Sequence, residues 1–278
     1  MLHKSIRAIF SVFALLMIGV FMYRVLQGNW SVLNWLMLSI AAVCTVLVFR
    51  CFVYIFNYSY GLACIGNGGV VAVGTGTQAG WLLGGLLALY GLRLFWFTWS
   101  RMRSASYAER MAGVRQADAA LPVPVKGALW LQCTFLYTFH LFALYFAGLQ
   151  GSLTPAGWAA AAIIAAGIVI EAVADAQKQA GKARHPDRFV TGGLYARWRH
   201  PNYVGEIAVQ VGILVAGIAA APAGWSALAA AVLAPLYIVV LMVAECFRAD
   251  HSMEQRYGEQ PAFQHYRARS GSMLPKVT

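Results

Sequence analysis

The stretch AIFSVFALLMIGVFMYRVL, residues 8–26, decides the fold class because it is apolar along nearly its whole length. A helix needs roughly 20 such residues to cross the hydrocarbon core of a membrane. The stretch contains one charged residue, Arg24, and lacks a convincing small-residue cleavage site. We therefore interpret it as a membrane-spanning helix and not as a signal peptide.

The composition of the whole chain agrees with a membrane protein. Hydrophobic residues make up 60% of it and charged residues only 11%, with a mean hydropathy of +0.63, whereas soluble domains carry about 25% charged residues. We expect an all-α, polytopic protein of about seven spans, with six further apolar runs at 30–56, 78–100, 124–148, 155–175, 202–221 and 224–247. The five cysteines are scattered without a CxxC pair or zinc-like His spacing, which favours buried thiols and predicts no metal site.

The basic residues predict the orientation of the bundle. Sixteen of the 21 Lys and Arg residues lie in the segments 101–126, 176–201 and 248–278. With seven spans these segments share one side of the membrane, which the positive-inside rule identifies as the cytoplasm. The N-terminus is then expected outside, against the charges of Lys4 and Arg7, and the C-terminus in the cytoplasm. The net charge of +11 is thus concentrated on one face of the protein, where it also suits contact with anionic lipids. Nucleic-acid binding is not expected, because no soluble domain remains to bind it.

The uncharged segment YSYGLACIGNGGVVAVGTGT, residues 58–77, is expected to form an external loop. The overlapping GTGTQAG, residues 74–80, comes close to the glycine fingerprint of dinucleotide-binding proteins. That fingerprint requires a preceding strand and a following helix within a βαβ unit. Here it precedes a membrane span on the wrong side, so we interpret it as flexible loop.

Polar residues inside the later spans follow helical spacing. Glu171 and Asp175 lie one turn apart, and Asn202, Glu206 and Gln210 form a second stripe. Ionisable groups within spans are costly and are functional candidates by default. With the basic segments beside them, they indicate a cation-rimmed basin suited to a ligand with phosphates and hydroxyls. The alternative, that they only hold helices together, stays open.

Three motifs then occur in order in the second half of the chain: ADAQKQAGKARHPD (174–187), GGLYARWRHPNYVGE (192–206) and FRADHSMEQRYGEQPAFQHYRARSGSMLP (247–275). The central motif resembles the hallmark of the steroid 5-alpha-reductase and sterol-reductase superfamily. The other two are similar to the segment before that hallmark and to the C-terminal tail of sterol reductases. The resemblance covers roughly residues 170–278. It looks closest to bacterial membrane proteins of unknown function grouped with the steroid 5-alpha reductases.

The resemblance implies that residues 151–278 bind NADPH and that residues 1–150 hold a lipid-like substrate. Carried onto matching positions, the cofactor contacts would be Asp175, Lys178, Lys182, Arg184, Tyr195, Arg199, His200, Asn202, Tyr203, Glu206, Arg248, His251, Tyr257 and Tyr266. Those expected at the phosphates are Lys178, Lys182, Arg184 and Arg248. Asn202 and Glu206 would address the nicotinamide end.

The implied activity is that of an NADPH-dependent oxidoreductase acting on CH–CH groups in steroid or lipid metabolism. A hydride would pass to an activated C=C, or to a C=O, of an apolar substrate entering from the bilayer. Steroid 5-alpha reductases use a Glu and a Tyr of the N-terminal half, and this chain has no acidic residue before Glu109. The proton-donor candidates are Tyr54, Tyr58, Tyr137 and His140. For each of them a structural role is the alternative.

Two other functions stay open. Isoprenylcysteine carboxyl methyltransferases share an RHP-x-Y-x-G hallmark and bind S-adenosylmethionine, so a membrane methyltransferase is the first alternative. Asn202 followed by Glu206, together with the pair Gln177 and Lys178, favours the reductases. The second is a non-enzymatic lipid-binding membrane protein. The expected partners are a lipophilic small molecule and membrane lipids, and the expected location is a bacterial inner membrane with the cofactor site facing the cytoplasm.

Overall fold

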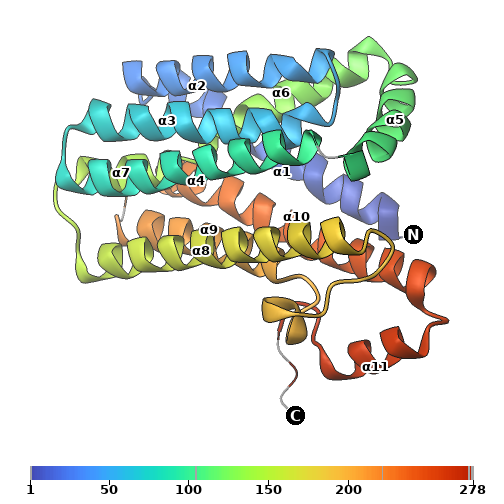
Figure 1. The fold of residues 1–278 in the computed structure, drawn as a ribbon. Coiled ribbons are helices and arrows are strands. Elements are labelled where there is room, and N and C mark those ends of the chain that lie inside the picture. Colours follow the sequence, from blue (N-terminus) through green and yellow to red (C-terminus); the bar gives the residue numbers. More distant parts are fainter. Residues whose placement is uncertain (1, 104, 221, 275, 277–278) are drawn as a thin grey trace. The chain divides into compact units, whose positions relative to one another are not determined.

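The computed structural model describes residues 2–103, 105–220, 222–274 and 276, and this part of the chain is helical nearly throughout (Figure 1). Seven helical segments are long and apolar enough to cross a membrane, which confirms the predicted all-α, polytopic architecture. These segments are Ile9–Leu26, Val32–Phe49, Gln78–Met102, Val123–Leu149, Pro155–Arg184, Pro201–Ala219 and Trp225–Tyr257.

The chain forms two compact units that are interleaved along the sequence. Unit 1 comprises Met1–Ala162 and Val211–Tyr237, and unit 2 comprises Ile163–Gln210 and Ile238–Thr278. Three helices run from one unit into the other: α8 (Pro155–Arg184), α9 (Pro201–Ala219) and α10 (Trp225–Tyr257). The predicted division at residue 150 concerns function, and it stays a prediction.

Unit 1 contains the N-terminal helices and a core of buried aromatic side chains. Its elements are α1 (Leu2–Leu26), α2 (Val32–Thr45), a 3₁₀ turn (Val46–Phe49), a π-helical turn (Ile55–Ser59), α3 (Tyr60–Thr75), α4 (Gln78–Met102), α5 (Ala105–Ala119), α6 (Val123–Phe139) and α7 (Phe142–Leu149). In the core, the ring of Phe142 lies 5.2 Å from that of Phe139 and 5.3 Å from that of Trp30. Aromatic pairs at such distances add to the stability that burial provides.

The segment predicted as an external loop, residues 58–77, is helical instead. Most of it forms α3, which lies beside α4 (Figure 1). The apparent dinucleotide fingerprint is the turn between these helices. Gly76 ends α3 with a φ of 63°, and the hydroxyl of Thr77 accepts a hydrogen bond of 3.0 Å from the N–H of Gly80. The motif therefore caps two helices and has no strand before it.

Glycines give α3 the sequence pattern of a loop, although they serve its contact with α4. A Cβ at Gly68 would lie 2.6 Å from the carbonyl oxygen of Gly84, and a Cβ at Gly61 would lie 2.9 Å from that of Gly91. These two pairs show that α3 and α4 run antiparallel with their backbones in contact. In soluble proteins glycine weakens helices, whereas in membranes small residues mark close helix contacts.

The chain turns sharply between the 3₁₀ turn and the π-helical turn. There Cys51 is buried against Tyr107 of α5, and the N–H of Phe52 donates a 2.7 Å hydrogen bond to Oδ1 of Asp118. This break therefore lies at the same end of unit 1 as α5. The predicted topology, with one span over residues 30–56, places this break and α5 on opposite sides of the membrane. The contact between this break and α5 does not fit that placement, and the side of the membrane on which each lies stays a prediction.

In unit 2 the helices run further than the apolar pattern indicates. α8 continues to Arg184 and α10 to Tyr257, past the predicted span ends at 175 and 247. The last turn of α8 carries Lys182 and Arg184, where the helix dipole favours cations. A 3₁₀ turn (Gly193–Ala196) and α11 (Pro261–Arg269) complete this unit. Basic residues beyond the predicted span ends thus sit on helical extensions.

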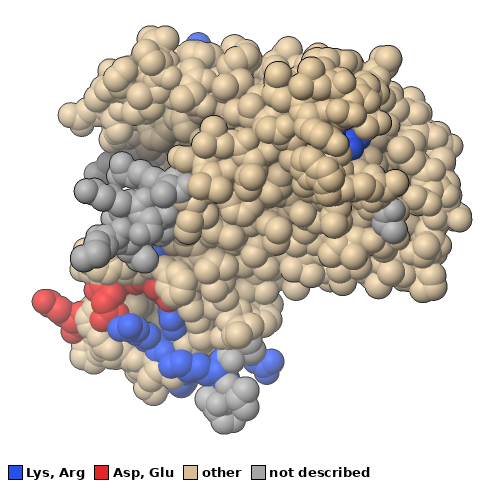
Figure 2. Space-filling view, turned by 180° about the vertical axis from the view of Figure 1, so that it is seen from behind, with Lys and Arg blue, Asp and Glu red and all other residues tan. Residues whose placement is uncertain are grey.

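Large apolar side chains are widely exposed, as helices that face lipid require. Examples are Leu15, Val32, Val43 and Trp96. On the face shown in Figure 2, Lys, Arg, Asp and Glu gather in one region, and few charged side chains appear elsewhere. This distribution agrees with a protein embedded in the bilayer.

Candidate functional site

The helices α8 and α9 meet closely in unit 2 because each carries a glycine at the contact. A Cβ at Gly167 would lie 2.7 Å from the carbonyl oxygen of Gly205, and a Cβ at Gly205 would lie 2.6 Å from the backbone nitrogen of Glu171. The side chains of Glu171, Asp175 and Glu206 are all buried. The predicted carboxylates are therefore buried, where acidic groups are costly and indicate function.

One face of α9 carries the predicted stripe of polar residues. Nε2 of Gln210 donates a hydrogen bond of 2.8 Å to Oε1 of Glu206, one turn away. Asn202, one turn earlier, is half-buried, and its Oδ1 is buried without a hydrogen-bond partner in the described part of the chain. Asn202, at the start of α9, can therefore accept a hydrogen bond from a ligand.

A second buried polar atom near the start of α9, the hydroxyl oxygen of Tyr195, also lacks a hydrogen-bond partner among the described residues. Oη of Tyr195 is buried and makes no hydrogen bond with any described residue. Burial raises the pKa of Tyr195, and the carboxylate of Asp175 raises it further, so the phenol keeps its proton and can donate it in a hydrogen bond. An unsatisfied buried polar group costs about 1–3 kcal/mol. A ligand that satisfied Tyr195 and Asn202 would recover that cost.

Asp250 on α10 holds the two residues that precede α9. Nε and Nη2 of Arg199 donate to its two carboxylate oxygens, each at 2.9 Å, and Nε2 of His200 lies 2.8 Å from Oδ1. The hydrogen bond with Asp250 raises the pKa of Arg199. Asp250 was absent from the predicted contacts, although the ADH motif at 249–251 contains it. Arg199 and His200 are thus oriented by a carboxylate that sequence reasoning missed.

The C-terminal tail fixes the same segment through its backbone. The N–H of Arg199 donates to the carbonyl of Gly271 at 2.8 Å, and the N–H of Gly271 donates to the carbonyl of Arg197 at 3.0 Å. The hydroxyl of Tyr266 donates to the carbonyl of Tyr195 at 2.8 Å, and burial raises the pKa of Tyr266 to about 12. Tyr195 and Arg199 therefore lie on a segment tied down at both ends.

Two of the cations predicted at phosphates are engaged within the chain. Nζ of Lys182 donates to the backbone carbonyls of Pro186 and Arg188 at 2.9 and 2.8 Å. The guanidinium of Arg248 pairs with both carboxylate oxygens of Glu245, with Nε 2.9 Å from Oε2. Lys182 thus closes the loop that follows α8, and Arg248 is neutralised by its own helix.

The remaining predicted contacts are dispersed over unit 2. The hydroxyl of Tyr257 lies 3.3 Å from Nζ of Lys182, and Lys178 is exposed on α8. Tyr203 stacks on the ring of His200 with 5.4 Å between centroids. His251 Nε2 lies 3.0 Å from a side-chain amide one turn further along α10. Unit 2 therefore brings the residues around α9 together and leaves Lys178 and His251 at its surface.

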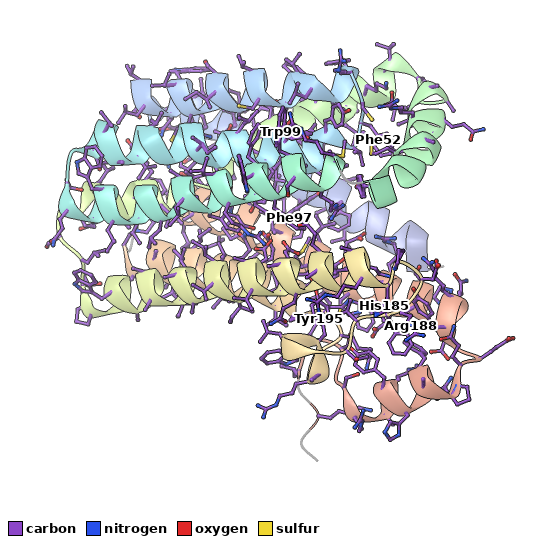
Figure 3. The ribbon with its side chains drawn as sticks, in the orientation of Figure 1. Phe52, Phe97, Trp99, His185, Arg188 and Tyr195 are labelled. Atoms are coloured by element: carbon purple, nitrogen blue, oxygen red, sulfur yellow. The ribbon has the colours of Figure 1, made fainter. Side chains whose placement is uncertain are left out.

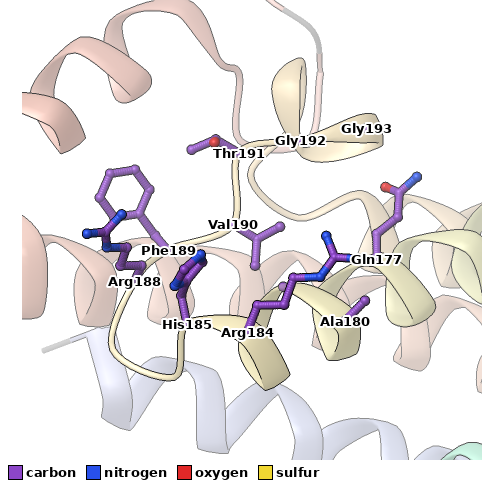
Figure 4. Close-up of a pocket in the computed structure, with 11 residues that line it drawn as sticks. Gln177, Ala180, Arg184, His185, Arg188, Phe189, Val190, Thr191, Gly192 and Gly193 are labelled. Carbon is purple, nitrogen blue, oxygen red and sulfur yellow. The ribbon is translucent and has the colours of Figure 1, made fainter.

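An open pocket of about 470 Å³ lies between the end of α8 and the loop that follows it. Its polar side chains include Gln177, Arg184, His185 and Arg188, and its far wall is the backbone at residues 192–193. In Figure 4 His185 lies between the two arginines, and Arg184 extends toward Gln177. Figure 3 places His185 and Arg188 on the same loop, with Tyr195 further along it. Of these residues only Arg184 was predicted.

The proton-donor candidates all lie in unit 1, in two groups. Tyr54 and Tyr58 are half-buried at the break before α3, with ring centroids 5.5 Å apart. Tyr137 and His140 are buried. The hydroxyl of Tyr137 donates a 2.7 Å hydrogen bond to the carbonyl of Ile55, and Nδ1 of His140 lies 3.9 Å from a cysteine sulfur. No group of three or more possible metal ligands occurs among the described residues.

The fold and these sites define a polytopic, all-helical integral membrane protein with a buried polar site in unit 2. The sequence profile of one family, described as "Protein of unknown function (DUF1295)", matches residues 56–270. Because this match spans more than half of the chain, the protein belongs to that family. No curated protein and no solved structure matches the chain.

Proposed function

We propose that this protein is a membrane-embedded reductase that uses NADPH to reduce a conjugated C=C bond, or a C=O bond, of a lipophilic substrate. When bound, NADPH supplies a hydride, and a proton from the protein completes the saturated product. The motif around α9 that resembles the steroid 5-alpha reductases motivates the proposal. The geometry of unit 2 supports it independently.

The observation that carries the proposal is the pair of unsatisfied atoms beside α9. Asn202 Oδ1 accepts hydrogen bonds and Tyr195 Oη donates them, and both are buried without a described partner. A carboxamide or a ribose has N–H or O–H donors and oxygen acceptors, which are the kinds of group that these two atoms require. The nicotinamide end of NADPH offers both groups, so the residues present fit this cofactor.

The other residues of unit 2 hold these two in place. Asp250 and the C-terminal tail fix the segment that carries Tyr195, and Gln210 orients Glu206. Binding sites gain affinity when their groups need no reorganisation. We therefore assign Arg199 and His200 to positioning, since their hydrogen-bonding groups are directed at Asp250.

The proton donor is proposed among the tyrosines at the break before α3. Tyr137 directs its hydroxyl hydrogen at a backbone carbonyl, which indicates a structural role. Tyr54 and Tyr58 are half-buried, and their hydroxyls make no hydrogen bond with described residues. A positioned phenol can polarise a conjugated oxygen and deliver its proton, and such general acids contribute about 10²–10⁴-fold to the rate.

The proposal is tested by NADPH binding to the purified full-length protein in detergent. Asn202→Ala and Glu206→Gln should each raise the dissociation constant for NADPH by about tenfold, because one good hydrogen bond in a desolvated site contributes roughly 1.4 kcal/mol. The control is Gln116→Ala, which removes an exposed amide on α5. Thermal unfolding confirms that each variant is folded. Wild-type affinity in both folded site variants would refute the assignment of this face of α9.

A further inference from the structure

We infer that the pocket beside the end of α8 binds a phosphomonoester group, held by Arg184, His185 and Arg188. Only one of these residues belongs to the set expected at phosphates from the motif resemblance. The geometry of the loop assigns the other two.

The cations of unit 2 divide into those with partners and those without. Lys182, Arg199, Arg248 and Arg267 each donate to carbonyls or carboxylates of the chain. The side chains at positions 184, 185 and 188 make no hydrogen bond or ion pair with any described residue. The unpaired basic side chains on the pocket wall are therefore those available to a ligand.

The pocket has the charge that a phosphate requires. No Asp or Glu lines it within the described part of the chain. The acidic residue of the loop, Asp187, has a side chain that is 95% exposed and lies 3.4 Å from Arg256. Two guanidinium groups and an imidazole line the pocket without a neutralising carboxylate among its described lining residues. Guanidinium groups bind phosphate oxygens through two parallel hydrogen bonds, which favours a terminal phosphate with three free oxygens.

The loop that carries these cations is held in position. Lys182 binds two of its carbonyls. The ring of Phe189 packs on Tyr257 with 5.4 Å between centroids and stacks on Tyr266 at the same distance. These contacts tie the loop to α10 and α11. Arg188, next to Phe189, is thus attached to a fixed backbone and not to a mobile segment.

The pocket adjoins the polar site of α9. Gln177 lines the pocket, and its Oε1 accepts a 2.9 Å hydrogen bond from the N–H of Leu194, next to Tyr195. Gly193, the residue before Leu194, has a φ of 63°, and a Cβ at this position would collide with the side chain of Gln177. A ligand with a phosphomonoester at one end and hydrogen-bonding groups at the other therefore fits both sites. The 2′-phosphate of NADPH is one source, which rests on the proposed function, and a phosphatidate headgroup is the other.

The test compares NADPH with NADH, which differ only in the 2′-phosphate, on the full-length protein in detergent. The variant is Arg184→Ala/Arg188→Ala. The control is Arg197→Ala/Arg269→Ala, which removes two exposed, unpaired arginines outside the pocket. We expect the variant to raise the dissociation constant for NADPH at least about tenfold and to leave that for NADH unchanged, while the control alters neither. A parallel arm measures the thermal stabilisation by phosphatidate in nanodiscs against phosphatidylcholine.

Each outcome separates the phosphate site from the reductase. If the wild type binds neither dinucleotide, but phosphatidate stabilises it and the pocket variant alone loses that effect, the phosphate site stands and the reductase proposal falls. If the pocket variant behaves like the control toward both NADPH and phosphatidate, the phosphate site is refuted. An equal loss of NADPH and NADH affinity would also refute it, because NADH has no phosphomonoester.

Discussion

Asp250 accepts hydrogen bonds from Arg199 and His200 and so ties α10 to the residues before α9. Nη1 of Arg199 also donates to the carbonyl of Ser270 at 2.6 Å. Three parts of unit 2 that are distant in sequence thus meet at the ion pair of Arg199 and Asp250. Its loss would leave a half-buried guanidinium without its charged acceptor.

Asp250→Asn should therefore lower the free energy of unfolding by about 1–3 kcal/mol, because hydrogen bonds to charged groups contribute about this much. Asp187→Asn is the matched control. Its carboxylate is 95% exposed, and exposed ion pairs contribute roughly 0–1 kcal/mol. Denaturant unfolding in detergent measures both. Equal stability of the two variants would show that the Asp250 cluster is not a structural centre.

The sequence motifs located much of the site but not its internal contacts. The stripe of Asn202, Glu206 and Gln210 follows from helical spacing alone, and the structure places it on one face of α9. The spacing of the basic residues does not show which of them bind to other parts of the chain and which line the pocket. Lys182 and Arg188 are both basic and six residues apart, yet the ammonium of one binds backbone carbonyls while the side chain of the other lines the pocket. That difference depends on the path of the loop.

At the scale of elements, the contact between α3 and α4 depends on glycines that only a helix pair requires. A Cβ at Gly84 would lie 2.5 Å from the carbonyl oxygen of Gly68 and 2.9 Å from the nitrogen of Ala72. At the next position, Gly85, a Cβ would meet nothing within 4 Å. A methyl group would therefore clash at Gly84 but has room at Gly85, the next residue of the same helix.

Gly84→Ala should destabilise the protein by about 1–3 kcal/mol, because the two backbones must separate to admit the methyl group. Gly85→Ala should be neutral or stabilising by up to about 1 kcal/mol, because alanine favours the helix. The unfolding midpoint of each variant in detergent checks the pair. If Gly84→Ala is as well tolerated as Gly85→Ala, the close packing of α3 on α4 is wrong.

The long apolar elements could be predicted from the sequence, whereas α3 could not. The hydropathy of a run such as 8–26 is that of a membrane span, so its burial in lipid is the dominant energy and its helical form follows. In α3, glycine, asparagine and threonine lower the apolar signal, and the helix is stabilised by its contact with α4 instead. The ends of α8 and α10 were misjudged for the same reason: they leave the lipid, and tertiary contacts maintain them.

At the scale of the whole molecule, we expect α3 to cross the membrane as well, which adds one crossing to the seven candidate spans. α1 and α2 are joined by a short turn, and α3, a shorter apolar helix than the seven candidate spans, runs antiparallel to α4. α1 accordingly begins at the same end of unit 1 as α5 (Figure 1). Lys4, Arg7 and Arg50 then share the side of the basic segment 101–126, in agreement with the positive-inside rule. We therefore expect the N-terminus in the cytoplasm and not outside.

Cysteine accessibility tests this topology. In a cysteine-free background, Ser5→Cys and Ala112→Cys should be protected from a membrane-impermeant maleimide applied to intact cells. Gln78→Cys, at the exposed turn between α3 and α4, should react. All three should react after the membrane is permeabilised. Labelling of Ser5→Cys together with Gln78→Cys in intact cells would restore the topology expected from hydropathy.

The proposed function requires that unit 2 binds NADPH. Its most direct test is the thermal unfolding midpoint of the purified wild-type protein, measured as NADPH or S-adenosylmethionine is added. A ligand at about 100 times its dissociation constant stabilises the folded state by about 2.7 kcal/mol. We predict that NADPH raises the midpoint in a saturable manner and that S-adenosylmethionine leaves it unchanged. A rise with S-adenosylmethionine alone would instead identify a methyltransferase and contradict the account.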